Sequence, residues 1–231
     1  MKQKTFAVDI DGTITENGGG RIHLEALSAL RHMTNMGHNV IFVTGRSSVE
    51  GFLLSMFGGT TSASVGENGG CITLETNKHI LLGDMEQCQN ALHILQSEIK
   101  NVVEKQVFPR MTEVVLERTF DLDSAKSIVQ EKNLDVVLSD SQYAYHVNSH
   151  GIDKGTGFKK MMKLLSISKD DVIAIGDSAT DIPLFQVSHT SVALGNASEH
   201  VRAAATMTVS APAGDGVIEA LDILASNLSE D

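Results

Sequence analysis

The feature that most constrains the fold is a series of short apolar runs separated by segments of helical periodicity. The first run covers residues 5–10 (T-F-A-V-D-I) and the second covers residues 39–44 (N-V-I-F-V-T). Neither alternates between apolar and polar residues, which indicates strands buried on both faces. Helices expected over residues 22–36 and 47–57 follow them and end at glycines. Repeated strand–helix units predict an α/β fold with a doubly wound, parallel, Rossmann-like sheet.

The pattern changes in the middle of the chain, after a short strand at residues 62–65 and a hairpin at residues 71–82. It then predicts a helix (84–105), a strand (112–118), a helix (121–132) and two strands (135–138 and 143–147). This order is typical of a small α+β unit on an antiparallel sheet. The α/β order then returns with helix 154–165, strand 171–175, helix 181–186, strand 191–194 and a helix near 217–224. We therefore predict a core of residues 1–82 and 152–231 and an inserted cap of residues 83–151.

Charge and cysteine content restrict the partners and the compartment to be expected for this chain. The chain of 231 residues carries 18 Lys and Arg against 29 Asp and Glu, a net charge of −11. This balance disfavours nucleic acid and anionic membranes as partners. Cys71 and Cys88 form no C-x-x-C pair, so we expect a reducing, cytoplasmic setting. No apolar run approaches about 18 residues, so neither a signal peptide nor a membrane span is expected.

Two aspartates stand at the end of the first apolar run, in Asp9-Ile10-Asp11-Gly12-Thr13. The carboxyl ends of strands in an open α/β sheet border the crevice where ligands bind, so both carboxylates should project towards it. An aspartate inside a buried run is strongly unfavourable without a partner or a metal. The alternative is a turn, in which Asp11-Gly12 leaves the strand and Asp9 accepts backbone hydrogen bonds.

A second acidic cluster, G-D-S-A-T-D, directly follows the strand expected at residues 171–175. Asp177 would end that strand and Asp181 would lie in the next helical turn, so both can face the same crevice. Taken alone, the pattern is explained equally well by a capping aspartate and an acidic first turn. Two acidic strand ends in one sheet repel each other, however, and Mg²⁺ prefers oxygen ligands of this kind. The two clusters together favour a magnesium site.

Two further positions are candidates for binding phosphate. Thr44-Gly45 ends the second apolar run, where a hydroxyl and the amides of a helix N-terminus can hold a phosphate oxygen. Helix capping by Thr44 or Ser47 is the simpler explanation of that pattern alone. Lys154 lies between Gly151 and Gly155, where the chain returns to the core, and glycines allow close approach of a ligand. A solvated lysine in a linker is the alternative.

The complete set of motifs resembles the haloacid dehalogenase-like phosphohydrolase superfamily. D-I-D-G-T, V-T-G-R, a lysine after a mid-chain insert, and G-D-S-A-T-D occur in the family's order, and the resemblance covers essentially the whole chain. The run Gly66-Glu67-Asn68-Gly69-Gly70 and the α+β insert are similar to those of the Cof-type branch. Within that branch, the short cap and modest length are most similar to those of the archaeal phosphoglycolate phosphatases.

The resemblance implies a role for each acidic residue. Asp9 would be the nucleophile that forms an aspartyl-phosphate, and Asp11 would be the acid and base that serves the leaving group and then water. The cofactor would be Mg²⁺, held by Asp9, by the backbone carbonyl of Asp11, by Asp177, and by Asp181 directly or through water.

The resemblance also implies that Thr44, with Gly45, holds the transferring phosphoryl group. Lys154 would neutralise the charge of that group and pair with Asp9. Asn196, after the last expected strand, would stand behind the metal or be an ordinary turn residue. The glycine-rich segment 17–20 would be a mobile turn beside the nucleophile or a plain loop.

Two residues of the cap are candidates for contacting a substrate carboxylate. Arg110 presents a planar fork matched to such a group, and His146 lies on an expected cap strand. The alternatives are a surface arginine and a strand histidine paired with backbone.

We therefore expect a Mg²⁺-dependent phosphatase for a small phosphomonoester, and the resemblance implies 2-phosphoglycolate, with glycolate and phosphate as products. A sugar-phosphate phosphatase of the same branch is the alternative. A non-hydrolytic phosphoacceptor switch would have no cap, and a phosphate-ester-binding protein would most naturally lack Asp9 or Asp11. The expected partner is a small phosphorylated metabolite, without nucleic acid or membrane, and a homodimer is left open.

Overall fold

The computed structural model describes residues 2–16, 20–141 and 143–228. The turn expected at residues 17–20 therefore lies, apart from Gly20, outside the described residues. Among the residues described, no helix is both long enough and apolar enough to cross a bilayer.

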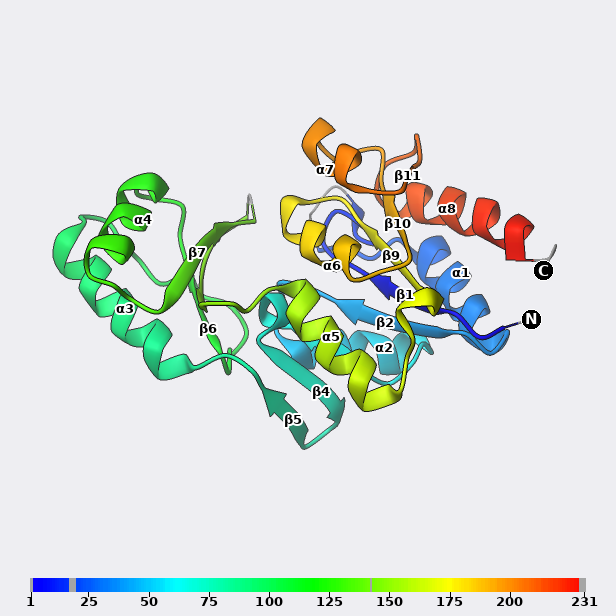
Figure 1. Ribbon diagram of the computed structural model, residues 1–231, viewed down its shortest axis with the longest axis horizontal. Helices are drawn as coiled ribbons and strands as arrows, with labels where there is room; N and C mark the ends of the chain where they lie inside the picture. The colour runs from blue at the N-terminus through cyan, green and yellow to red at the C-terminus, as the bar shows by residue number, and fades with distance from the viewer. Residues whose placement is uncertain (1, 17–19, 142, 229–231) are drawn as a thin grey trace.

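The larger sheet has the strand order β11-β10-β9-β1-β2-β3-β4-β5 (Figure 1). Its strands are β1 (Thr5–Val8), β2 (Asn39–Val43), β3 (Ser64–Gly66), β4 (Cys71–Glu75), β5 (Lys78–Leu81), β9 (Val172–Gly176), β10 (Thr190–Ala193) and β11 (Met207–Thr208). β1 pairs in parallel with β2 on one side and with β9 on the other. Only the β3–β4 and β4–β5 pairings are antiparallel, which forms the predicted hairpin at the sheet edge. The doubly wound parallel sheet is thus confirmed.

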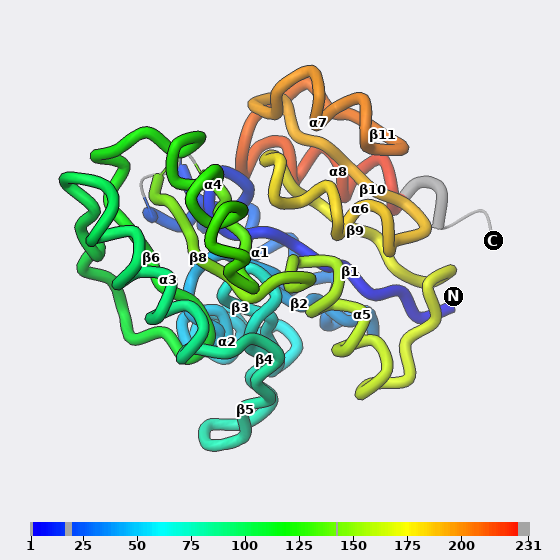
Figure 2. Tube along the Cα trace, turned by 60° about the vertical axis from the view of Figure 1, so that its left-hand side comes forward, coloured from blue at the N-terminus to red at the C-terminus, as the bar shows by residue number. Residues whose placement is uncertain are grey.

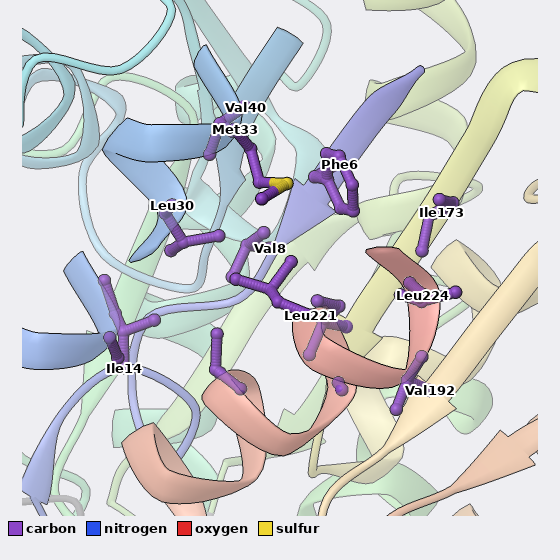
Figure 3. Packing of buried hydrophobic residues seen from close by; sticks show 14 of the residues in the cluster. Phe6, Val8, Ile14, Leu30, Met33, Val40, Ile173, Val192, Leu221 and Leu224 are labelled. Atoms are coloured by element: carbon purple, nitrogen blue, oxygen red, sulfur yellow. The ribbon is translucent and has the colours of Figure 1, made fainter. Parts of the chain in front are cut away.

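Alternate residues of the central strands face two separate apolar cores, as expected of strands buried on both sides. Phe6 and Val8 belong to the core beneath α1 (Leu24–Asn35) and α8 (Ala213–Leu228). Ala7 belongs to the core on the other face, beneath α5 (Lys154–Leu165), α6 (Ile182–Gln186) and α7 (Glu199–Ala204). Figure 3 shows side chains that pack around Phe6 and Val8: Leu30, Met33, Leu221 and Leu224.

The helices of the described chain are α1 (Leu24–Asn35), α2 (Ser48–Gly58), α3 (Met85–Glu98), α4 (Leu122–Glu131), α5 (Lys154–Leu165), α6 (Ile182–Gln186), α7 (Glu199–Ala204) and α8 (Ala213–Leu228). Short 3-10 turns are η2 (Glu67–Gly69), η3 (Lys169–Asp171) and η4 (Ala179–Asp181). The short elements α7 and β11 were not predicted.

The segment between β5 and α5 forms a smaller antiparallel sheet with the order β6-β8-β7. Its strands are β6 (Glu113–Leu116), β7 (Val136–Asp140) and β8 (Tyr145–Ser149). α3 and α4 share an apolar core with this sheet, and Figures 1 and 2 both show this layer at one side of the molecule, away from α8. The predicted order of elements is confirmed, whereas the domain limits at residues 83 and 151 stay a prediction.

One predicted helix is too long. The expected helix over residues 84–105 ends at Glu98, and Asn101 adopts a left-handed conformation with φ of 64°. Residues 103–105 then run beside β6, since Lys105 N donates to Val115 O at 2.8 Å. The apolar residues that extend the helical pattern, Ile99 and Val102, instead pack into the core of the smaller sheet.

The strand order determines where a ligand can bind. β1 lies between β2, which follows it in the chain, and β9, which comes much later. The order in which strands are added to the sheet therefore reverses between β1 and β9. Ligands of open α/β sheets bind beyond the carboxyl ends of strands at such a switch point. Both acidic motifs directly follow these two strands.

Candidate active site

Asp9 stands at the end of β1, beside the end of β9. Its backbone N–H donates to Ile175 O at 3.0 Å, and its side chain is buried. Gly12 completes the following turn with φ of 80° and lies so close to Asp177 that a Cβ there would be 2.4 Å from Oδ2. A side chain at position 12 would therefore push the two acidic motifs apart.

Three carboxylates converge at the switch point. Asp9, Asp177 and Asp181 each contribute one oxygen, and these oxygens lie within 4.8 Å of one another. Burial, reinforced by the charges of Asp181 and Asp177, raises the pKa of Asp9 well above its usual range. Burial and the charge of Asp181 raise the pKa of Asp177 to about 7. Ionised carboxylates held this close fit a divalent cation, because the cation offsets both the repulsion and the loss of solvation.

Lys154, the first residue of α5, places its ammonium group between two of these carboxylates. Nζ lies 2.7 Å from Asp9 Oδ1 and 2.6 Å from Asp181 Oδ1, and the side chain is only 2% exposed. Burial opposes the charge of Lys154, but the two carboxylates outweigh burial and raise its pKa. Lys154 therefore stays protonated and holds Asp9 in place.

Asp181 makes contacts with both of its oxygens. While Oδ1 accepts from Lys154, Oδ2 accepts from Asp177 N at 3.1 Å, from Ser178 N at 2.9 Å and from Ser178 Oγ at 2.9 Å. Asp181 thus shapes the loop after β9 as well as contributing charge.

Asp177 is oriented by two neutral side chains. Thr13 Oγ1 donates to Asp177 Oδ1 at 3.1 Å, and Asn196 Nδ2 donates to Asp177 Oδ2 at 2.8 Å. Asn196 Nδ2 also reaches Gly12 O at 2.9 Å, and its Oδ1 accepts from Ala213 N at 2.9 Å. The structure thus places Asn196 directly behind Asp177.

The side chain of Asp11 lies apart from the acidic cluster and pairs with Arg46. The Arg46 guanidinium donates from Nε and Nη2 to the two Asp11 oxygens, at 2.8 and 2.7 Å, and from Nη1 to Glu50 at 3.2 Å. This pairing, with the Asp11 hydrogen bond as its largest contribution, raises the pKa of Arg46. Arg46 was not predicted as a site residue from the sequence, although its place two residues after Thr44 was an available signal.

Thr44 and Gly45 follow β2 at the same edge of the sheet. The buried Thr44 hydroxyl accepts from Arg46 N at 3.0 Å, whereas the N-cap of α2 is Ser47, which forms a capping box with Glu50. Gly45 packs against Asn68, where a Cβ would lie 3.1 Å from Oδ1. Because Ser47 caps α2, helix capping does not explain the presence of a buried threonine at position 44.

A buried polar network joins the smaller sheet to the edge of the larger one. Glu67 in η2 accepts from Met111 N at 2.9 Å and from the backbone and hydroxyl of Thr112 at 2.7 Å each. Burial raises the pKa of Glu67. Glu113, at the start of β6, is the other buried carboxylate of this network. The sequence suggested no role for Glu67 beyond its place in the run of residues 66–70, and nothing in it pointed to Glu113.

The two candidate residues of the cap differ in where they reach. Arg110 Nη1 donates to the carbonyl oxygen of Gly45 at 2.9 Å, so it contacts the Thr44-Gly45 motif directly. His146 is buried with Nδ1 3.1 Å from Glu113 Oε2 and Nε2 3.0 Å from Ser141 Oγ. The structure therefore brings Arg110 to the sheet edge and leaves His146 behind Glu113.

The sequence profile of the haloacid dehalogenase-like hydrolase family matches residues 6–108 and 84–221. The chain belongs to the haloacid dehalogenase-like hydrolase family. The phosphoglycolate phosphatase of Nitrosopumilus maritimus is 75% identical to this hydrolase over 230 residues and covers 100% of both chains. The phosphoglycolate phosphatase of Methanosarcina mazei is 34% identical over 228 residues, covering 98% of this chain and 99% of the relative.

Solved structures share the fold of this hydrolase. A Thermoplasma acidophilum protein superimposes with a TM-score of 0.85 at 21% identity, covering 96% of this chain and 98% of the other. A haloacid dehalogenase-like hydrolase from Bacteroides thetaiotaomicron gives a TM-score of 0.78 at 18% identity, covering 96% and 100%. The inserted smaller sheet is therefore part of a fold already seen in solved structures.

Proposed function

We propose that this hydrolase is a phosphatase that converts 2-phosphoglycolate to glycolate and phosphate through an aspartyl-phosphate on Asp9. The observation that carries the mechanism is the buried contact between Lys154 and Asp9 beside two further carboxylates. The substrate is supported by the relative of 75% identity, which is named phosphoglycolate phosphatase.

Asp9 acts as the nucleophile in this mechanism. Lys154 donates to Oδ1, whereas the sole contact of Oδ2 among the described residues is a long one of 3.5 Å from the Thr13 hydroxyl. Oδ2 attacks phosphorus, an oxygen–phosphorus bond forms, and the bond to the glycolate oxygen breaks. Water then attacks the same phosphorus, the bond between phosphorus and Asp9 Oδ2 breaks, and phosphate leaves with the Asp9 carboxylate restored. One difficult hydrolysis thus becomes two easier steps.

Asp11 acts as the acid and then the base. It lies two residues beyond the nucleophile and outside the acidic cluster, with a side chain that is 40% exposed. In its protonated form it donates a proton to the departing glycolate oxygen, and the carboxylate so formed then accepts a proton from the attacking water, which restores the acid. The Arg46 fork keeps the carboxylate in one orientation between these steps.

The acidic cluster fits Mg²⁺ because all its donors are carboxylate oxygens. Asp9, Asp177 and the backbone carbonyl of Asp11 would hold the ion directly. Asp181 would contact it through water, since both oxygens of Asp181 already accept hydrogen bonds from the protein. When bound, the ion supplies positive charge that offsets the phosphoryl oxygens and the carboxylates.

Thr44 and Gly45 would bind the phosphoryl oxygens through a hydroxyl and a backbone amide. Lys154 would neutralise the remaining charge of the phosphoryl group, which explains how a chain with a net charge of −11 accepts an anionic substrate. The cap of residues 83–151 would select a small cytoplasmic metabolite by size. A homodimer remains compatible with this function.

The test measures phosphate release from phosphoglycolate, hexose and pentose phosphates and p-nitrophenyl phosphate, with Mg²⁺ or with EDTA. We expect preferential, Mg²⁺-dependent turnover of phosphoglycolate that is lost in Asp9→Asn. A preference for a sugar phosphate would retain the mechanism and change the substrate. Absence of turnover with every ester would contradict the proposal and favour a phosphoacceptor or a binding protein.

A further inference from the structure

We infer that Arg110 recognises the carboxylate of the substrate through the edge of its guanidinium formed by Nε and Nη2. This inference rests on the proposed function and adds a specificity-determining residue to it. Arg110 precedes β6 and is 9% exposed, so its charge lies inside the molecule at the junction of the two sheets.

Arg110 lies on the segment that precedes β6 of the smaller sheet and contacts the Thr44-Gly45 motif of the larger sheet. Its Nη1 donates to Gly45 O at 2.9 Å, and Gly45 directly follows Thr44. In phosphoglycolate, one methylene group separates the carboxylate from the ester oxygen. A substrate whose phosphoryl group lies on Thr44 therefore has its second anionic end within the neighbourhood of Arg110.

Among the described residues, one edge of the guanidinium has no hydrogen-bond partner. Nη1 donates to Gly45 and lies 3.4 Å from Glu113 Oε1. Nε is buried, and neither Nε nor Nη2 donates to any residue in the part of the chain that the structure describes. An unpaired buried donor is unfavourable, and a carboxylate matches the Nε–Nη2 edge with two parallel hydrogen bonds.

Glu113 fixes the orientation of Arg110. Its Oε2 accepts from Asn148 at 3.0 Å and from Asn68 at 3.2 Å and lies 3.1 Å from His146 Nδ1. Three contacts on Oε2 leave Oε1 directed to Arg110. His146 and Asn68 are therefore positioning residues that act through Glu113 and Arg110, and Asn68 also packs against Gly45.

The backbone of η2 is strained where it joins this network. Glu67 and Asn68 have φ of 55° and 51°, in the left-handed region that side chains rarely adopt. Strain of this kind is found where surrounding structure holds a functional group in place. Buried ionic networks add little net stability. Both considerations assign to the network the orientation of Arg110.

The experiment compares two esters that differ only in the carboxylate, phosphoglycolate and 2-hydroxyethyl phosphate. The proteins are the wild type, Arg110→Ala, Arg110→Gln and, as a matched control in the cap, Arg118→Ala. Arg118 is 43% exposed and pairs with Asp140 away from Gly45. The readout is the ratio of kcat/KM for the two esters, with KM and kcat determined separately.

We expect the wild type and Arg118→Ala to prefer phosphoglycolate. Arg110→Ala should lower kcat/KM for phosphoglycolate by about 100-fold, chiefly through KM, because it removes one partner of a buried charge-assisted contact. The ratio should then approach one. Arg110→Gln retains a donor for Gly45 and should show the same loss of preference, even if Arg110→Ala folds poorly.

An unchanged ratio in both Arg110 variants, or an equal loss for both esters, would overturn the assignment. A second ester pair, phospholactate and 1-hydroxypropan-2-yl phosphate, separates the failure of the proposed substrate from the failure of the proposed role of Arg110. If the wild type prefers phospholactate to phosphoglycolate and Arg110 carries that preference, the proposed substrate fails and the role of Arg110 holds. If the wild type turns over each carboxylate ester no better than its hydroxymethyl analogue, both the proposed substrate and the proposed role of Arg110 fail.

Discussion

Lys154 compensates two buried carboxylates at once, so its contribution to stability is coupled to its proposed contribution to catalysis. Asp9 and Asp181 each lie within 2.7 Å of its ammonium group, and all three side chains are at most 4% exposed. Breaking a buried ion pair by removing one partner leaves an uncompensated charge, which is far more unfavourable than losing a surface pair.

Lys154→Met should lower the free energy of unfolding by about 3–5 kcal/mol at neutral pH in EDTA. The loss should be smaller at acidic pH, because protonation of the two carboxylates relieves their repulsion. Urea unfolding followed by circular dichroism measures both values, with Lys160→Met, an exposed change on the same helix, as the control. Equal unfolding free energies of Lys154→Met and Lys160→Met would contradict the claim that a protonated Lys154 compensates the two buried carboxylates.

The ionisation of Glu113 makes the free energy of unfolding depend on pH, and the sign of this dependence follows from its pKa. Burial disfavours its charged form, but His146 and Arg110 outweigh burial and lower its pKa below the ordinary value of 4.5. A carboxyl group with a depressed folded-state pKa stabilises the protein above its unfolded pKa, and this contribution is lost as pH falls through the folded value.

Glu113→Gln should therefore be destabilised relative to wild type at pH 7, by about 2–4 kcal/mol, since His146 and Arg110 lose a charged partner. The difference in unfolding free energy between the two proteins should shrink below pH 4.5. Thermal or urea unfolding across pH 3–8 measures it. A difference that stays constant over this range would show that Glu113 is neutral in the folded protein.

At the scale of single residues, the polar residues at strand ends could be predicted from the sequence, whereas their long-range hydrogen-bond partners could not. Asp9, Thr44 and Asp177 could be chosen because a polar group after a buried run needs an explanation within a few residues of sequence. Lys154 was chosen differently, from the glycines around it where the chain returns to the core. The Arg46 fork on Asp11 spans 35 residues, and the role of Arg46 depends wholly on that contact. Long-range contacts of this kind are visible only in the folded chain.

Helix ends show how local and tertiary effects compete at the scale of single elements. The end of α5 is determined by local backbone conformation. Ser166 takes the left-handed conformation, with φ of 56°, that glycine adopts most easily. The end of α3 is tertiary, because residues 103–105 pair with β6 instead of continuing the helix. The sequence pattern therefore located α5 correctly and extended α3 too far.

Ser166→Gly should stabilise the protein by about 1 kcal/mol, because glycine adopts the left-handed region without a steric penalty. Lys132→Gly is the matched control at the end of α4, where φ is −85° and glycine offers no such gain. Urea unfolding of the two variants and the wild type measures the difference. A Ser166→Gly variant no more stable than wild type would indicate that the serine is not strained.

For the whole molecule, the parallel sheet gathers groups that are distant in sequence at one edge. Residues 9–13, 44–46, 154 and 177–181 meet there only because β1 lies between β2 and β9. The order of elements, with an α+β unit inserted in a doubly wound sheet, was predictable from periodicity. The positions of α7 and β11 were not, because elements of six and two residues carry too weak a periodic signal.

Binding of Mg²⁺ at the acidic cluster should stabilise the folded chain as a whole. At a concentration 100 times the dissociation constant, a ligand specific for the folded state adds about 2.7 kcal/mol. We expect the melting temperature to rise with Mg²⁺ in the wild type and to stay unchanged in Asp177→Asn. An equal rise in both proteins would place the ion elsewhere.

The central claim is that Asp9 carries the phosphoryl group during turnover. The most direct measurement is mass spectrometry of the enzyme quenched in acid during turnover of phosphoglycolate, followed by mapping of the modified peptide. We predict a phosphoryl group on the peptide containing Asp9 in the wild type and none in Asp9→Asn. A wild-type enzyme that turns over substrate with no phosphoryl group on Asp9, or with one on another residue, would contradict the mechanism.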